Sequence, residues 1–303
     1  ATMNYRLGCF VCLICLGAGL VISSAQVAIT EFMASNNKTL ADQDGDFSDW
    51  IEIFNAGSTP VSLGGWCLSD ASDDLQKWTF PNTTLPADGL LVVFASGKNR
   101  ANPGAQLHTS FSLDANGEYL ALVQPNGTIA SEFNPAFPEQ LPDVSYGSWQ
   151  GTNYYFSKPT PGTANASGFV AFVADTKFSH DRGFFEAPFN LTISTETTNA
   201  VIRFTTNGVP PSATNGTVYS GPIPIQGTTT LRAAAFKTGY LPSNVDTESY
   251  IFLDDVIRQS PTGAPPPGWP STWGSNVRDH GMDPDVVNNP LYSGTIKNDL
   301  KSL

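Results

Sequence analysis

Short runs in which hydrophobic and polar residues alternate, separated by turn residues, make up most of the chain. Residues 49–55 read DWIEIFN, which predicts a strand with Ile51 and Ile53 on one face and a tryptophan, a glutamate and a phenylalanine on the other. Residues 90–95 (LLVVFA) form a continuous apolar run, typical of a strand covered on both sides. Residues 125–128 (PNGT) are a strong hairpin signal. Such strands recur about every ten residues with little helical periodicity, which favours a β-sandwich or barrel.

The strand pattern is interrupted once and later fades, which divides the chain into regions. Residues 159–162 (PTPG) close a stretch rich in small and turn-forming residues, so we expect a first domain over residues 26–167. The pattern restarts over residues 168–253 with about six or seven strands, the size of one immunoglobulin-like sandwich. Residues 254–303 contain the stiff segment APPP and no clear core. We interpret them as a linker toward a domain that follows the last residue.

The N-terminus has the pattern of a secretory signal peptide. Residues 7–22 (LGCFVCLICLGAGLVI) are apolar and uncharged, Arg6 precedes them, and Ser23–Ala25 supply the small residues of a cleavage site. The run is short for a membrane-spanning helix, so we expect a signal peptide over residues 1–25 and no stable membrane insertion after cleavage. A retained anchor, or a metal site on the C-x-x-C-x-x-C spacing within the run, are the alternatives. The remaining Cys67 is expected to be a buried thiol.

Charge and composition exclude several function classes. Only 14% of the 303 residues are charged and the net charge is −12, so the chain lacks the charged surface of long exposed helices. It has no basic run, and we therefore expect no nucleic-acid partner. The three histidines are spread along the chain without metal-binding spacing, and no nucleophile elbow or phosphate-binding loop is present. We assign no catalytic residue, and we expect the chain not to be an enzyme.

Several motifs in the first region resemble the lamin tail domain, in particular its bacterial secreted members. They are ITEF (29–32), DWIEIFN (49–55), VSLGGWCL (61–68), GEYLALVQPNG (117–127) and the closing PTPGTAN (159–165). The resemblance covers nearly half of the chain. It implies an immunoglobulin-like β-sandwich, which in that family is a non-catalytic module beside nucleases, kinases or hydrolases.

Residues 183–253 resemble the small β-sandwich at the C-terminus of chitobiases and β-hexosaminidases. The motifs are AVIRFTTNG (200–208), YSGPI (219–223) and TLRAAA (230–235). In that family the region is an accessory domain outside the catalytic barrel. Together the two resemblances predict an all-β protein, with two immunoglobulin-like β-sandwich domains in tandem and an irregular, proline-rich C-terminal tail.

The C-terminal tail carries a third resemblance. RDHGMDP (278–284) and SGTI (293–296) are similar to the approach to a spore-coat-H-like kinase domain in bacterial multidomain proteins. This resemblance implies that a kinase domain, absent from these 303 residues, follows the tail.

The densest acidic cluster is a candidate cation site. Asp42, Asp44, Asp46 and Asp49 surround a glycine, and such closely spaced carboxylates suit Ca²⁺, which takes six to eight oxygen ligands. The spacing departs from an EF-hand, because Phe47 stands where its glycine would be. The alternative interpretation is a solvated acidic turn that leads into a strand. Calcium is the one cofactor that the sequence suggests.

Three neighbouring aromatic residues form a candidate ligand-binding group. Trp149, Tyr154 and Tyr155 lie close together in the sequence, and exposed rings of this kind stack on sugars or anchor a protein partner. The alternative is that they pin the last strand of the first domain to its own core.

We interpret the chain as a non-catalytic extracellular accessory region, secreted or on the cell surface, that serves in binding, adhesion or spacing. The expected partner is an extracellular polysaccharide or a cell-surface protein. Three alternatives stay open. The chain is the N-terminal part of a kinase-like or hydrolytic enzyme whose catalytic domain lies beyond residue 303, it is a carbohydrate-binding module, or it is a spacer without a ligand.

Overall fold

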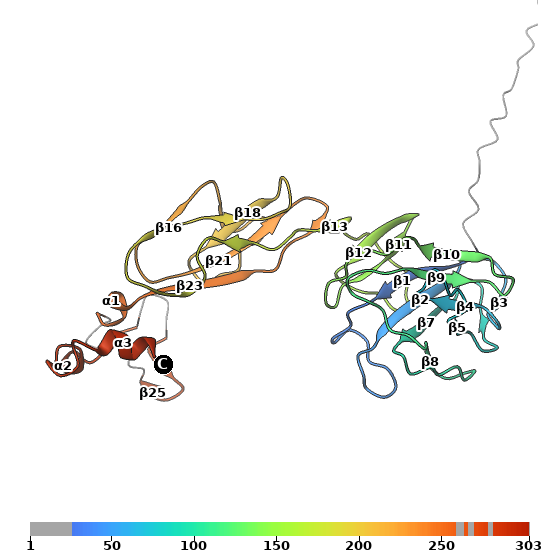
Figure 1. Cartoon of the computed structure of the whole chain (residues 1–303), viewed down its shortest axis with the longest axis horizontal. Helices are drawn as coiled ribbons and strands as arrows, with labels where there is room; N and C mark the ends of the chain where they lie inside the picture. Colours follow the sequence, from blue (N-terminus) through green and yellow to red (C-terminus); the bar gives the residue numbers. More distant parts are fainter. Residues whose placement is uncertain (1–25, 259–263, 266–269, 278–280, 303) are drawn as a thin grey trace, which may run out of the picture. The chain divides into compact units, whose positions relative to one another are not determined.

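The structure of the protein is a computed structural model that describes residues 26–258, 264–265, 270–277 and 281–302 (Figure 1). The predicted signal peptide lies outside these residues. The described chain is nearly all β-structure, which confirms the predicted fold class. Its helices are short: α1 (Leu253–Val256), α2 (Pro284–Val287) and α3 (Ile296–Lys301). None of the described helices is both long enough and apolar enough to span a bilayer.

The described residues pack into two compact units. One contains residues 26–29 and 51–138, and the other contains residues 30–50 and 139–302. The predicted boundaries at residues 25, 167 and 253 differ from this division, and they stay predictions.

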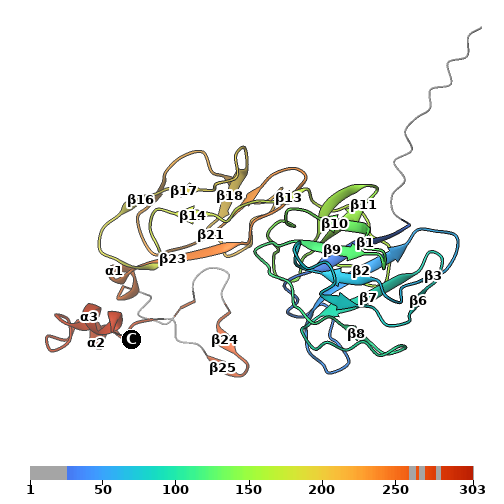
Figure 2. The same ribbon diagram turned by 45° about the vertical axis from the view of Figure 1, so that its right-hand side comes forward.

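A six-stranded sheet dominates the N-terminal half (Figure 2). Its order is β12-β11-β1-β2-β7-β8, with β1 (Val27–Met33), β2 (Asp49–Asn55), β7 (Leu90–Ala95), β8 (Leu107–His108), β11 (Ser145–Trp149) and β12 (Thr152–Phe156). A four-stranded sheet has the order β10-β9-β4-β5, with β10 (Ile129–Phe133), β9 (Leu120–Val123), β4 (Cys67–Ser69) and β5 (Trp78–Thr79). The pair β3 (Val61–Ser62) and β6 (Thr84–Leu85) completes this half.

Strand β2 shows how the sequence pattern becomes a core. Trp50, Ile51, Glu52 and Ile53 are all fully buried, so both faces of the strand are covered. The strand ends at Asn55, whose side-chain amide donates to backbone carbonyls of the loops that follow β2 and β6, at 2.9 Å to Thr59 O and 2.9 Å to Pro86 O. Buried polar groups require such partners.

A second, five-stranded sheet organises the C-terminal half. Its order is β15-β23-β21-β18-β19, with β15 (Gly183–Phe185), β23 (Asp246–Phe252), β21 (Thr229–Phe236), β18 (Val201–Thr205) and β19 (Thr217–Val218). The small pairs are β13 (Ala171–Phe172) with β22 (Tyr240–Leu241), β14 (Lys177–Phe178) with β17 (Ile193–Ser194), β16 (Phe189–Leu191) with β20 (Ile223–Ile225), and β24 (Thr272–Trp273) with β25 (Asn276–Val277).

The core of this half lies on one face of the five-stranded sheet. Leu231, Ala233 and Ala235 of β21 are fully buried there, together with Tyr250 of β23. The ring of Phe185 packs edge-on against Tyr250, with ring centroids 5.5 Å apart. Because side chains alternate along a strand, the residues between these core positions point to the opposite face.

Candidate functional site

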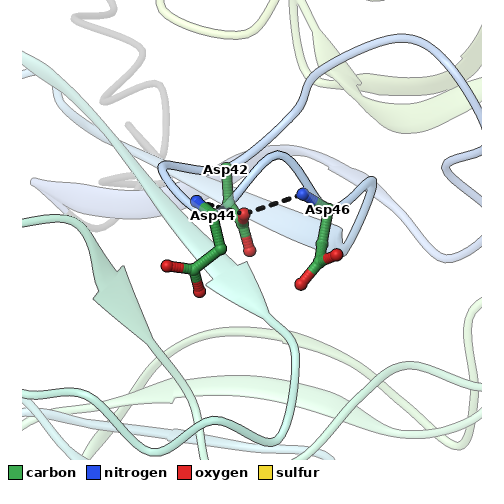
Figure 3. Close-up of side chains that lie close together, drawn as sticks. All are labelled: Asp42, Asp44 and Asp46. Carbon is green, nitrogen blue, oxygen red and sulfur yellow. Dashed lines mark hydrogen bonds between the residues drawn. The ribbon is translucent and has the colours of Figure 1, made fainter.

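The acidic loop between β1 and β2 brings three of the four predicted cation ligands together. One carboxylate oxygen from each of Asp42, Asp44 and Asp46 lies within 4.8 Å of the others (Figure 3). Asp42 is buried, whereas Asp44 and Asp46 are exposed. Asp49 is not part of this group and forms the first residue of β2. The loop therefore presents two exposed carboxylates beside a buried one.

The buried carboxylate of Asp42 holds the loop in its turn. Its Oδ1 accepts hydrogen bonds from the backbone N–H groups of Asp44, at 2.9 Å, and Asp46, at 3.0 Å (Figure 3). Its Oδ2 accepts from the Ser48 hydroxyl at 3.3 Å. Gly45 adopts φ +86° between them, a left-handed conformation that suits glycine. These bonds are those of an acidic turn, which was the alternative interpretation of the sequence.

A buried asparagine closes the base of the same loop. The side-chain amide of Asn36 donates to Leu40 O at 2.7 Å and to Ser48 O at 2.8 Å, and its carbonyl accepts from Thr39 N at 3.0 Å. Asn36 is 5% exposed. The loop conformation is therefore fixed by side chain–backbone hydrogen bonds at both its base and its tip.

Asp143 anchors the start of the loop from a distant part of the sequence. Its Oδ1 accepts from the backbone N–H groups of Asn37, at 2.9 Å, and Lys38, at 3.0 Å, and from the Thr39 hydroxyl at 3.1 Å. Partial burial acts to raise the pKa of Asp143, but these hydrogen bonds and the Lys38 ammonium outweigh it and hold the pKa below its ordinary value. No feature of the sequence near residue 143 indicated this role.

Acid should weaken the anchor formed by Asp143. A carboxyl group whose pKa is lowered by folding contributes stability above its unfolded pKa, here 3.8, and that contribution is lost as the pH falls through the folded pKa. We expect Asp143→Asn to unfold more readily than the wild type at about pH 7, and the difference to shrink at about pH 3. Urea denaturation of both proteins at the two pH values measures this. A difference that is independent of pH would contradict the assignment.

Calcium binding at the acidic loop stays a prediction. Asp44 and Asp46 offer hard oxygen ligands, but the loop is already held by hydrogen bonds to Asp42. If calcium binds the folded loop, millimolar calcium should raise the melting temperature relative to a chelator, and Asp44→Asn should abolish the rise. Melting curves that are identical in calcium and in chelator would remove calcium from consideration.

The aromatic group at the β11–β12 hairpin separates into two faces. The rings of Trp149 and Tyr154 lie 6.1 Å apart in an edge-to-face arrangement, and both residues are half-buried. Tyr155 points to the opposite face, is 4% exposed and donates its hydroxyl to Glu139 O at 2.8 Å. Burial raises the pKa of Tyr155 well above its ordinary value. A sugar could therefore contact Trp149 and Tyr154, but the fold covers Tyr155.

The segment after the hairpin pairs with the edge of β12, where Phe169 and Tyr155 exchange backbone hydrogen bonds of 2.8 and 2.9 Å. Gly168 comes so close that a Cβ atom there would sit 2.8 Å from the Cβ of Tyr154 and 2.9 Å from the ring of Phe156. This close packing at the edge of β12 supports the interpretation that the rings pin the last strand of the domain.

A buried carboxylate that the sequence did not reveal holds the same region closed. Glu31 is fully buried, and it accepts hydrogen bonds from the Ser145 hydroxyl, from Thr160 N at 3.0 Å and from the Thr160 hydroxyl at 2.7 Å. Asn165 adds two bonds, to Thr30 O at 2.9 Å and to Ser148 O at 3.0 Å. We call Glu31, Ser145, Thr160 and Asn165 the closing clasp. Its carboxylate is engaged in hydrogen bonds that join β1 to the residues after β12.

Comparison with known families matches the two halves separately. Residues 21–135 match the family model of the Lamin Tail Domain, and residues 181–247 match that of the Chitobiase/beta-hexosaminidase C-terminal domain. The chain carries two immunoglobulin-like β-sandwich domain types in tandem. A search of curated proteins gives no match to this chain. The matches confirm two of the resemblances seen in the sequence and their order along the chain.

The lamin-tail match contains the acidic loop but ends before β11, so the closing clasp spans the match and the residues after it. Both matched domains are non-catalytic types, and no catalytic family is indicated. The resemblance of the tail to the approach to a kinase domain stays a prediction, since no comparison tests it and residues 278–280 lie outside the described residues.

Proposed function

We propose that this chain is a non-catalytic accessory region of an exported protein, and that it binds or spaces partners outside the cell. The tandem of two non-catalytic immunoglobulin-like domain types carries this proposal. The state of Glu31 supports it, because the hydrogen bonds of the closing clasp occupy its buried carboxylate.

We place the chain in the medium or on the cell surface. The apolar, uncharged N-terminal run supports export, and the chitobiase C-terminal domain is typical of extracellular proteins. The partner is then an extracellular polysaccharide or a cell-surface protein. Fractionation of cells expressing the chain with a C-terminal tag should recover it outside the cytoplasm. Recovery in the cytoplasm alone would contradict export.

A pull-down distinguishes a binding role from a spacing role. We expect purified chain to be retained on at least one of chitin, cellulose and peptidoglycan, while an unrelated acidic β-sandwich protein passes through. Binding that saturates as the amount of polymer increases would support a specific site. Absence of retention on all three would reject these polymers as partners and leave an acidic polysaccharide, a protein partner or a spacer role.

Carbohydrate binding is the more specific candidate function, and a cavity in the chitobiase-like half favours it. The cavity measures about 470 Å³, and its lining includes the aromatic residues Phe169, Phe236 and Tyr240 together with the polar residue Asn199. Small-ligand sites typically combine an apolar lining with a few polar groups, in this range of volumes.

A further inference from the structure

One segment of this acidic protein contains no acidic residue. The chain has 27 Asp and Glu residues against 15 Lys and Arg residues, yet none of the 27 falls within residues 197–245. The same segment contains Arg203, Arg232 and Lys237. Local charge is therefore positive in a molecule of net charge −12.

The fold gathers these cations on one side of the five-stranded sheet. Ile202 and Leu231 belong to the core, so the neighbouring Arg203 of β18 and Arg232 of β21 point to the outer face. Arg203 pairs with Ala234 in the register of the two strands, and Arg232 lies two residues before Ala234. The arginines are thus diagonal neighbours, a spacing within reach of long side chains.

Within the described residues, the two arginines form hydrogen bonds with neutral backbone carbonyls and with no carboxylate. Arg203 Nη1 donates to Gly216 O at 2.9 Å, and Arg232 Nη1 donates to Gly208 O at 3.0 Å. The Nε atom of Arg232 is buried without a hydrogen-bond partner. Like charges on neighbouring strands repel, so an anion at this face would offset that cost.

The third cation stands beside the cavity that Arg203 also lines. The Nζ atom of Lys237 lies 4.2 Å from the centre of the Tyr240 ring, a cation–π contact. Arg203, Lys237, Asn199 and the rings all line the cavity, and the described residues place no carboxylate in its wall. The cavity therefore offers two positive charges, one amide and an apolar floor.

We propose that this cavity, together with the outer face of β18 and β21, binds an acidic polysaccharide through the carboxylates of its uronic acid units. The proposal rests on the carbohydrate-binding function above and specifies its ligand. The planar guanidinium of Arg203 matches a carboxylate in geometry. The apolar floor suits the C–H faces of a sugar ring, and the Asn199 amide suits its hydroxyls. Three cations on a chain of net charge −12 are too few for a nucleic acid, whose affinity depends on many phosphate contacts.

The test is calorimetric titration of the purified chain with oligogalacturonate and with a neutral galactan oligomer of equal length. We expect binding of oligogalacturonate, weaker or undetectable binding of the galactan, and an affinity that falls as salt rises. Arg203→Gln and Lys237→Gln should each weaken oligogalacturonate binding about tenfold, a change that corresponds to one lost charge-assisted contact. Melting curves of both variants establish that they are folded.

The matched control is Lys177→Gln. This exposed cation lies on β14, pairs with Glu196 at 2.5 Å and takes no part in the cavity lining. We expect it to leave the affinity unchanged, and an equal loss in this variant would show a non-specific charge effect and overturn the site.

Three other outcomes also decide the matter. Equal affinity for the neutral galactan would overturn the acidic ligand and leave carbohydrate binding standing. Binding of polyglutamate or single-stranded DNA as tight as that of oligogalacturonate would overturn the polysaccharide as ligand. Retention on chitin, cellulose or peptidoglycan that survives both substitutions would place carbohydrate binding elsewhere on the chain and reject this cavity.

Discussion

Replacing Glu31 with alanine should lower the free energy of unfolding by about 3 kcal/mol or more, the largest single effect that we expect. The Glu31 carboxylate is fully buried and accepts hydrogen bonds from Ser145 and Thr160. Hydrogen bonds to a charged group contribute about 1.5–3 kcal/mol each, and their loss leaves the donors without a partner. Chemical denaturation followed by tryptophan fluorescence measures the change.

Glu139→Ala is the matched control for this substitution. Glu139 is exposed, and its backbone carbonyl, which accepts from the Tyr155 hydroxyl, survives the substitution, so the stability should change by less than about 0.5 kcal/mol. Thr160→Val removes the hydrogen bond from the Thr160 hydroxyl to Glu31, and its loss of stability should lie between those of Glu31→Ala and Glu139→Ala. Equal stabilities of Glu31→Ala and Glu139→Ala would show that the closing clasp does not hold the fold.

Truncation of Leu231 should have the second-largest effect. Leu231 of β21 is fully buried, in the core formed with Leu191, Ile193 and Tyr250. Replacing a buried leucine with alanine removes apolar contacts and leaves a cavity, which costs about 2–5 kcal/mol. We expect Leu231→Ala to lower the free energy of unfolding by an amount in this range, measured by urea denaturation.

Val170→Ala is the control for Leu231→Ala. Val170 is 54% exposed, and its backbone N–H bond to Gly239 O at 3.0 Å survives the substitution. A loss of about 0.5 kcal/mol or less is expected for an exposed site. If the Leu231→Ala and Val170→Ala variants had equal free energies of unfolding, the core at β21 would contribute little to stability.

Local patterns predicted the strands well. The runs at Asp49–Asn55 and Leu90–Ala95 form strands with the predicted bounds, because each run contains its own alternation or apolar density. The order of the two sandwich types was also predicted from short motifs, and the family matches confirm it. These features depend on residues that are close in the sequence.

The candidate site was predicted only in part, because its geometry depends on strand faces and distant contacts. Asp42, Asp44 and Asp46 come together in a tight turn, whereas Asp49 already belongs to a strand. Tyr155 is adjacent to Tyr154 in the sequence but points to the other face of β12, a separation that the period of two for a strand could have shown.

The sequence places Glu31, Thr160 and Asn165 in two motifs shared with the lamin tail domain, but it did not predict that these motifs bind each other. Glu31 and Thr160 are separated by 129 positions, and nothing around either residue indicates that one binds the other. The positive face of the five-stranded sheet, in contrast, did leave a signal in the sequence. The absence of Asp and Glu from residues 197–245 can be counted directly in the sequence, and only its placement on neighbouring strands required the structure.

A single measurement addresses the proposed role most directly: incubation of the purified chain with a panel of neutral and acidic polysaccharides, with retention and released products quantified in the same samples. We expect retention on an acidic polysaccharide, as proposed for the cavity of the second sheet. Because the two matched domains are non-catalytic types, we also expect no shorter sugars above the level of a heat-denatured control. Chain-dependent release of shorter sugars, or passage of the folded chain through every polymer in the panel, would contradict a non-catalytic polysaccharide-binding role.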